Sequence, residues 1–295
     1  MFKVSRLCIP VGGECNFHCR YCFRDQNHPE IPSDMTDVMK EYLQQVSPSW
    51  CRAVVLSGGE PLLHWDTVQK IRELVNPSVN VCILSNGSLL TRDKVDYINS
   101  HYMEFYLSHD GARTKELRGV DVLEDPEVLE CVKRVRLLTI APVITNKNPD
   151  VMEVYRYIAQ KLRRDNFYYL HGTVMDNGHC QDLITGFDYD VYARSFREFV
   201  RRYYKTTNTR FLISNKRGHC SFEVNLHGIV TNKITGQRYG TVLDSYADCE
   251  RVMRRLCRNS YCSDTKCPLQ GACSYYEEYA NEHNCRCSMI RSGYL

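Results

Sequence analysis

The sequence predicts an α/β fold: a partial (β/α)6 TIM-like barrel with a small cysteine-rich C-terminal domain. Short apolar runs alternate with amphipathic helical segments along the first 175 residues, which is typical of parallel strands joined by crossover helices. Nine of the 16 cysteines lie from Cys180 onward, so the C-terminal part has a different character. We expect a barrel domain at 1–175, a helical linker at 176–209 and a cysteine-rich domain at 210–295.

The elements follow from these patterns in chain order. Six β-branched or apolar runs predict strands at Phe2–Ile9, Ala53–Leu56, Val79–Leu84, Met103–Leu107, Leu137–Ile144 and Phe167–His171. Helices are predicted between them at Met35–Gln45, Trp65–Leu74, Arg92–Ser100, Pro126–Arg136 and Val151–Arg164. Further along we expect a helix at Asp190–Tyr204, a hairpin of Phe222–Asn225 and Ile229–Asn232, and a helix at Asp244–Arg258. Six parallel strands would curl into a barrel without closing it.

The composition is that of a globular protein, and the absence of a secretory signal favours a reducing compartment. The chain has 295 residues, 43% of them hydrophobic and 25% charged, and its net charge of +3 neither requires nor excludes a nucleic-acid partner. Its first eight residues contain no apolar signal segment, and no window approaches the length of a membrane span. We therefore expect a cytoplasmic protein without membrane contact, whose clustered cysteines bind metal rather than form disulfides.

Three cysteines follow directly on the first predicted strand. Cys15, Cys19 and Cys22 are separated by three and then two residues, so their thiolates can converge from one loop. A 4Fe-4S cluster has four irons that are normally held by four cysteines. Three local ligands would leave one iron open, as in catalytic metal sites. The alternative is half a zinc knuckle formed by Cys19 and Cys22.

This CxxxCxxC pattern, with the aromatic Tyr21 before its last cysteine, resembles the signature of the radical S-adenosylmethionine (SAM) superfamily. The segments after the next strands are similar to further motifs of that superfamily: Ser57-Gly58-Gly59-Glu60-Pro61, Ser85-Asn86-Gly87, Ser108-His109-Asp110-Gly111 and Thr145-Asn146. The resemblance implies that the open iron binds the amino and carboxylate groups of SAM. It also implies that one electron cleaves SAM to a 5′-deoxyadenosyl radical, which abstracts hydrogen from a substrate.

The resemblance also implies a set of cofactor-binding residues at the strand ends. Its members are Tyr21, Gly58, Gly59, Glu60, Pro61, Ser85, Asn86, Ser108, Asp110 and Thr145. Glu60 would accept the methionyl ammonium of SAM, and Ser108 and Asp110 would lie near its ribose. His109 is expected to face solvent or substrate. Ligands bind at the carboxyl ends of strands in parallel sheets, which is where these motifs fall.

The C-terminal cysteines resemble the SPASM/twitch extension of radical SAM enzymes, which carries auxiliary iron–sulfur clusters. The pattern is Cys262-x4-Cys267-x5-Cys273 followed by Cys285 and Cys287, and it departs from the extension at Lys233 and Glu277, where cysteines are expected. We predict one auxiliary 4Fe-4S cluster, with two clusters or a structural zinc site as the alternatives.

The resemblance implies a radical SAM enzyme, and the auxiliary-cluster pattern favours a peptide as its substrate. A small molecule, as in twitch-type dehydrogenases, and a tRNA are the alternative substrates. A zinc-binding module without catalysis is a remote alternative. The enzyme would need an external one-electron reductant of the flavodoxin or ferredoxin kind. The sequence predicts no catalytic base. We expect Cys8, Cys51, Cys82 and Cys131 to be buried as small apolar side chains.

Overall fold

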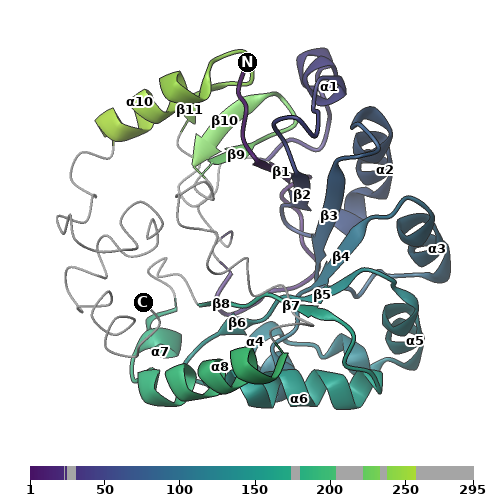
Figure 1. Cartoon of the computed structure of the whole chain (residues 1–295), viewed down its shortest axis with the longest axis vertical. Coiled ribbons are helices and arrows are strands. Elements are labelled where there is room, and N and C mark those ends of the chain that lie inside the picture. Colours follow the sequence, from purple (N-terminus) through teal and green to yellow (C-terminus); the bar gives the residue numbers. More distant parts are fainter. Residues whose placement is uncertain (23, 25–30, 174–179, 204–221, 233–237, 257–295) are drawn as a thin grey trace.

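The computed structural model describes residues 1–22, 24, 31–173, 180–203, 222–232 and 238–256 (Figure 1). Its centre is a six-stranded parallel sheet in the order β1-β2-β3-β4-β5-β7. The strands are β1 Arg6–Pro10, β2 Ala53–Ser57, β3 Asn80–Ser85, β4 Glu104–Leu107, β5 Leu138–Ile140 and β7 Tyr168–Tyr169. Within the described residues β1 and β7, the two ends of this order, do not pair with each other. The predicted α/β fold with a parallel, partial barrel is confirmed.

Helices cover the outer face of the sheet, as Figure 1 shows. They are α1 Asp37–Gln44, α2 Trp65–Leu74, α3 Arg92–Ser100, α5 Pro126–Arg134 and α6 Val151–Leu162. Four of them begin after a side chain whose oxygen accepts a backbone N–H, namely Thr36, Thr91, Asp125 and Asp150. The ends of all five helices lie within two residues of those predicted.

The strands separate two sets of apolar side chains, because successive residues of a strand point to opposite faces. Leu7 and Ile9 of β1 belong to the large core between sheet and helices. Cys8 belongs instead to a smaller cluster with Cys82 and Tyr106, on the inner side of the barrel. The four cysteines predicted to be apolar fillers, Cys8, Cys51, Cys82 and Cys131, are buried.

The predicted strand at Leu137–Ile144 is divided in two. It forms β5 and then β6 Val143–Ile144, which leaves the main sheet and pairs with β8 Gly172–Thr173. Pro142 lies between them, and proline has no N–H to donate to a sheet. The one-strand prediction was therefore wrong at this proline.

The first residues of the chain pack against the C-terminal sheet and are not part of β1. Strands β9 Phe222–Val224, β10 Ile229–Asn232 and β11 Arg238–Thr241 form an antiparallel sheet in the order β11-β10-β9. The N–H of Phe2 donates to the Val242 carbonyl (2.8 Å), and its ring contacts Phe222 at 5.7 Å between centroids. The predicted hairpin is confirmed, the third strand was missed, and the first strand starts at Arg6 instead of Phe2.

The remaining described α-helices are α4 Thr114–Arg118, α7 Gln181–Ile184, α8 Tyr189–Tyr203 and α10 Tyr246–Leu256, of which α8 packs on α6. The predicted auxiliary-cluster ligands Cys262, Cys267, Cys273, Cys285 and Cys287 lie outside the described residues. The domain limits and the cysteine-rich domain therefore stay predictions. Among the described residues, no helix combines the length and apolar character needed to cross a membrane.

Candidate functional site

Cys15, Cys19 and Cys22 lie in the loop after β1, at the carboxyl edge of the sheet. Cys15 is exposed, the other two are partly buried, and the Cys22 N–H donates to the Cys19 carbonyl (3.0 Å). Among the described residues, no three His, Cys, Asp or Glu side chains are grouped closely enough to hold a single metal ion. A cube-shaped cluster binds each thiolate through a different iron, so its ligands stand further apart. The three thiols stay candidates for a cluster that they would hold through separate irons.

The three thiols also influence one another electrostatically. Burial raises the pKa of the Cys19 thiol to about 11; the Arg118 guanidinium lowers that pKa, while Cys22 and Cys15 raise it further. Burial is also the main cause of the raised pKa of Cys15. Three neighbouring thiolates repel one another, and a bound cationic metal removes that cost. This donor set therefore favours a bound metal centre.

Gly58 and Gly59 bring the loop after β2 against the cysteine loop. A Cβ on Gly59 would lie 2.0 Å from the Glu14 carbonyl oxygen, and one on Gly58 would lie 2.5 Å from the Gly12 oxygen. Gly58 also has a φ of 130°, a conformation that favours glycine. The Glu60 N–H donates to the Glu14 carbonyl (2.8 Å). In the structure these glycines make room for a neighbouring stretch of backbone.

Glu60 is a buried carboxylate surrounded by neutral donors. It is 1% exposed and accepts hydrogen bonds from Ser85 Oγ (2.7 Å), the Asn86 N–H (2.8 Å) and the Leu62 N–H (3.0 Å). Pro61 follows it and opens a 3-10 turn that Glu60 caps. Burial raises the pKa of Glu60, and these donors oppose that rise. No Lys, Arg or His nitrogen of the described chain lies within ion-pair distance of it.

Asn86 connects the end of β3 to the cysteine loop. Its Nδ2 donates to Asn16 Oδ1 (2.9 Å), and Asn16 in turn donates to Ser88 Oγ (2.8 Å). Asn16 directly follows Cys15. The strand-end motif at Ser85–Gly87 thus holds both the Glu60 carboxylate and the start of the cysteine loop.

Asp110 is buried like Glu60 but is saturated by protein groups. It is fully buried, and Arg118 donates to it through Nε (2.7 Å) and Nη2 (3.2 Å). The Tyr21 hydroxyl and the Val143 N–H (2.8 Å) donate to it as well. Ser108, at the start of the same motif, is partly exposed. Asp110 thereby joins the cysteine loop, through Tyr21, to the turn after β4.

His109 does not face solvent or substrate, and that expectation was wrong. The ring is fully buried; Gly111 N–H donates to Nδ1 (3.2 Å), which leaves Nε2 to donate to Asp121 (2.8 Å). Although burial alone would raise it, hydrogen bonds from His109 and Tyr157 lower the pKa of Asp121 to about 2. This network supports the turn that carries Asp110.

Thr145 is also turned inward. Its side chain is fully buried, its hydroxyl donates to Asn148 Oδ1 (2.8 Å), and it accepts the Lys147 N–H (3.0 Å). Its described contacts therefore lie within its own turn.

Two arginines at the site have partners that sequence reasoning did not find. Arg118 ends α4 Thr114–Arg118, a helix too short to show an amphipathic period. Its Nη1 lies 4.0 Å from Cys19 Sγ, and its guanidinium lies 5.2 Å from the centre of the Tyr21 ring. Arg24 forms a buried ion pair with Glu223 of β9, a partner 199 residues away that no local pattern could reveal. The cysteine loop is thus held from the barrel and from the C-terminal sheet.

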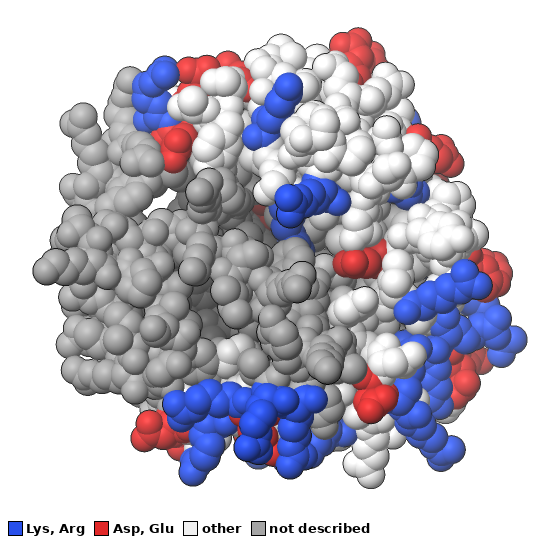
Figure 2. Space-filling view, in the orientation of Figure 1, with Lys and Arg blue, Asp and Glu red and all other residues white. Residues whose placement is uncertain are grey.

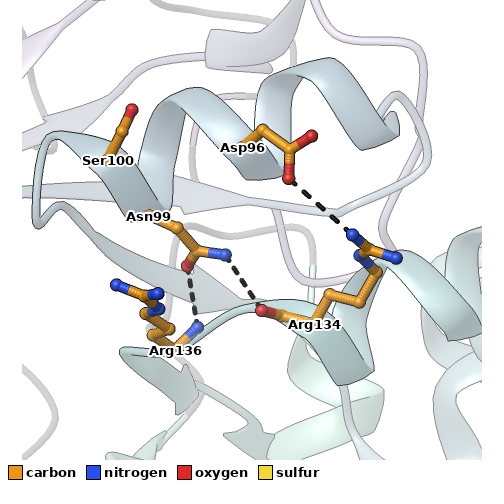
Figure 3. A pocket seen from close by; sticks show the side chains of 5 residues that line it. All are labelled: Asp96, Asn99, Ser100, Arg134 and Arg136. Atoms are coloured by element: carbon orange, nitrogen blue, oxygen red, sulfur yellow. Dashed lines mark hydrogen bonds and ion pairs between the residues drawn. The ribbon is translucent and has the colours of Figure 1, made fainter.

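A polar depression of about 450 Å³ lies elsewhere, between α3 and α5 (Figure 3). Asn99 bridges these elements: its Nδ2 donates to the Arg134 carbonyl (3.0 Å), and its Oδ1 accepts the Arg136 N–H (2.9 Å). Arg136 precedes β5, so this depression is at the amino edge of the sheet, opposite the cysteine loop. Its hydrogen bonds join two helices and have no part in the site.

Basic side chains gather along the lower edge of the molecule, over α8 in Figure 1 (Figure 2). Glu198 of this helix pairs with Arg202 (3.2 Å) and with Arg156 of α6 (3.4 Å). Glu198 thus partly neutralises the basic charge of this surface. The surface gives no specific support to a nucleic-acid partner.

A profile of the radical SAM superfamily matches residues 9–158, just over half of the chain. An S-adenosylmethionine-dependent nucleotide dehydratase of Selenomonas ruminantium is 23% identical over 268 residues, covering 83% of this chain and 94% of that protein. The chain spans 58%, 49% and 61% of the length of three further curated relatives.

Two solved structures share the fold. The structure of anSMEcpe with AdoMet and a Cp18Cys peptide has a TM-score of 0.65 at 17% identity, over 98% of this chain and 99% of that one. Streptococcus suis SuiB bound to its precursor peptide SuiA has a TM-score of 0.64 at 15% identity, over 94% of this chain and 72% of that one.

Proposed function

Because this chain belongs to the radical SAM superfamily and is a SAM-dependent iron–sulfur enzyme, we propose that it modifies a peptide by abstracting a hydrogen atom from it. When bound, the 4Fe-4S cluster supplies the electron that cleaves SAM and so starts this chemistry. Cys15, Cys19 and Cys22 would hold that cluster. The observation that supports this assignment is the position of all three thiols in one loop, braced by the motifs at three strand ends.

Glu60 would bind the methionyl ammonium of SAM. It is a buried carboxylate without a cationic partner in the described chain, so a ligand ammonium is the charge that it lacks. The Ser57 hydroxyl, at the end of β2, is buried without a hydrogen-bond partner among the described atoms and offers one more polar group there. Ser85 and Asn86 would orient the carboxylate through their hydrogen bonds.

The remaining cofactor-binding residues have supporting roles in this proposal. Gly58, Gly59 and Pro61 would shape the turn that presents Glu60, and Tyr21 and Asp110 would fix the cysteine loop. Ser108 and Thr145 stay candidates by their position at the strand ends. The barrel core and loops would exclude water from the site, which radical chemistry requires.

A peptide substrate is supported by two features. The fold extends over nearly the whole of anSMEcpe, a protein whose solved structure holds a peptide. The sequence also ends in the cysteine pattern that predicts an auxiliary cluster, with Cys262, Cys267, Cys273 and one of Cys285 or Cys287 as ligands. An external flavodoxin- or ferredoxin-like protein would supply the electrons.

A nucleotide is the second candidate substrate, and one specific observation favours it. The nucleotide dehydratase of S. ruminantium aligns over 94% of its own length. The two candidates separate in one assay. A peptide library and a mixture of nucleoside triphosphates are each incubated with enzyme, SAM and dithionite, and 5′-deoxyadenosine and substrate mass are measured. A mass change in a peptide supports our proposal; a change only in a nucleotide overturns it.

The assignment of the cluster loop has its own test. The protein is reconstituted anaerobically, and iron, sulfide and 5′-deoxyadenosine are measured in wild type and in Cys15/Cys19/Cys22→Ala. We expect the variant to lose about four irons and all deoxyadenosine. The control Cys131→Ala removes a buried thiol of α5 and should retain both. Zinc alone in the wild type, with no deoxyadenosine, would contradict the proposal.

A further inference from the structure

The guanidinium of Arg118 has three nitrogens, and each has a partner in the described structure. Nε and Nη2 form a fork on the Asp110 carboxylate, at 2.7 and 3.2 Å. The third nitrogen, Nη1, lies 4.0 Å from Cys19 Sγ, within hydrogen-bond reach of a sulfur acceptor. The fork leaves the guanidinium only one orientation, so Nη1 has a fixed direction toward the thiol.

The charge of this arginine is retained although it is buried. Its side chain is 6% exposed, and that burial alone would lower its pKa. Asp110, Tyr21 and Cys19 raise the pKa well above its ordinary value, so the guanidinium stays charged. The face of Tyr21 covers the same guanidinium, with 5.2 Å between Cζ and the ring centre. A fixed positive charge therefore lies beside the middle cysteine of the loop.

The backbone places α4 against the cysteine loop as well. The Arg20 N–H donates to the Leu117 carbonyl (2.9 Å), one residue before Arg118. The helix ends at Gly119, whose φ of 86° turns the chain away immediately afterward. Two consecutive residues of α4 thus contact two consecutive residues of the loop, which fixes the register between them.

We propose that Arg118 is a positioning residue that donates a hydrogen bond to the Cys19 thiolate when the cluster is bound, and so favours the reduced cluster. This inference rests on the proposed function of the cysteine loop. Reduction adds one electron, from an external low-potential donor, and makes the cluster and its thiolates more negative. Hydrogen bonds to the sulfurs favour that more negative state and raise the reduction potential.

The test is an anaerobic redox titration of the reconstituted protein, followed by the electron paramagnetic resonance signal that changes when SAM is added. Asp110→Asn/Arg118→Met removes both buried charges together, so that neither is left unpaired. We expect this variant to retain its iron. The equilibrium constant for reduction of its cluster should be at least tenfold lower, which corresponds to a reduction potential about 59 mV lower for one electron. Arg113→Gln, an exposed arginine that pairs with Glu116 on the same turn, is the matched control and should keep the wild-type potential.

Arg118→Lys is the second variant, and it decides the question if the double variant does not fold. Lysine keeps a positive charge, but one ammonium cannot form the fork on Asp110 and also reach Cys19 in a fixed direction. We expect the reduction potential to fall here too, by less than in the double variant. A double variant that folds, binds its iron and keeps the wild-type reduction potential overturns the proposal. If the double variant does not fold, a wild-type reduction potential in Arg118→Lys overturns it. Absence of iron from the wild-type protein would instead overturn the function of the cysteine loop itself.

Discussion

Glu60 and Asp110 are both buried carboxylates at the carboxyl edge of the sheet, Glu60 after β2 and Asp110 after β4. They differ in whether a positively charged side chain pairs with them. Asp110 faces the Arg118 guanidinium, which forms a two-point ion pair with it. Glu60 is surrounded by one hydroxyl and two backbone N–H groups, and the charged Lys94 acts on it only from a distance. Lys94 itself donates to the Leu89 carbonyl (2.9 Å).

The difference separates a supporting carboxylate from one that needs a ligand. A buried charge is stable only when it is paired, and Asp110 has its pair within the chain. Glu60 has no such partner among the described residues, so its ionised form would gain stability from an added cation. Burial and position alone would have given the two residues the same role, whereas their partners distinguish them.

The largest expected effect is on stability, at Asp110. Asp110→Asn leaves the Arg118 guanidinium buried without its counter-charge, and we expect a loss of about 3–5 kcal/mol in the free energy of unfolding. Urea unfolding of the reconstituted protein measures it. Asp110→Asn/Arg118→Met should recover part of this loss. A single-variant loss below about 1 kcal/mol would show that the pair behaves like an exposed one.

The next effect is on SAM binding, at Glu60. Glu60→Gln keeps the shape of the side chain but removes its charge, so SAM affinity should fall about tenfold to hundredfold, or roughly 1.5–3 kcal/mol. Because the new amide nitrogen cannot accept the backbone N–H that one carboxylate oxygen accepts, its free energy of unfolding should fall by about 1–3 kcal/mol, less than that of Asp110→Asn. Equilibrium binding to the reconstituted protein measures the affinity, and Glu116→Gln, an exposed carboxylate of α4, is the control. Unchanged affinity in Glu60→Gln would remove the distinction between the two carboxylates.

A fall in pH should lower the affinity for SAM and raise the contribution of Glu60 to the stability of the SAM-free protein. Burial raises its pKa above the ordinary 4.5, and the ionised form is the one that binds an ammonium. SAM affinity should therefore fall as pH decreases through that raised pKa, by up to about tenfold per pH unit below it.

Protonation of Glu60 also favours the folded state, because the folded protein binds the proton more tightly than the unfolded chain. The stability of the SAM-free wild type relative to Glu60→Gln should consequently rise over the same fall in pH. Binding and unfolding series on both proteins measure the two trends. Parallel trends in the wild type and in Glu60→Gln would assign the pH dependence to another group.

The smallest expected effect is at Tyr21. Tyr21→Phe removes one of the donors to Asp110 and leaves the Arg118 fork in place, so we expect a loss of about 1 kcal/mol. The same urea unfolding series provides the comparison. A loss as large as that of Asp110→Asn would mean that the hydroxyl, rather than the ion pair, holds the loop.

Much of this arrangement could be predicted from local sequence patterns. The five outer helices have strong periodicity, four of them have side-chain caps, and the strands before the motifs are short apolar runs. The cysteine loop and the strand-end motifs share one edge because parallel strands share a direction. These features depend only on residues near one another in the chain.

The remaining features depend on contacts between distant residues. No local pattern near Arg118 predicts its contact with Cys19, 99 residues away, and none near Arg24 predicts its ion pair with Glu223. The position of His109 was wrongly predicted because its partner Asp121 lies beyond the turn. The single strand predicted at Leu137–Ile144 was wrong because Pro142 divides it into β5 and β6. The unequal pairing of Glu60 and Asp110 is a property of the same kind.

The most direct test of this account is the electron paramagnetic resonance spectrum of the reconstituted, dithionite-reduced protein, recorded with and without SAM. We predict a 4Fe-4S signal that SAM changes in the wild type, that needs a far higher SAM concentration to change in Glu60→Gln, and that is absent from Cys15/Cys19/Cys22→Ala. A wild-type signal that saturating SAM leaves unchanged would contradict an open iron beside Glu60, and with it the proposed site.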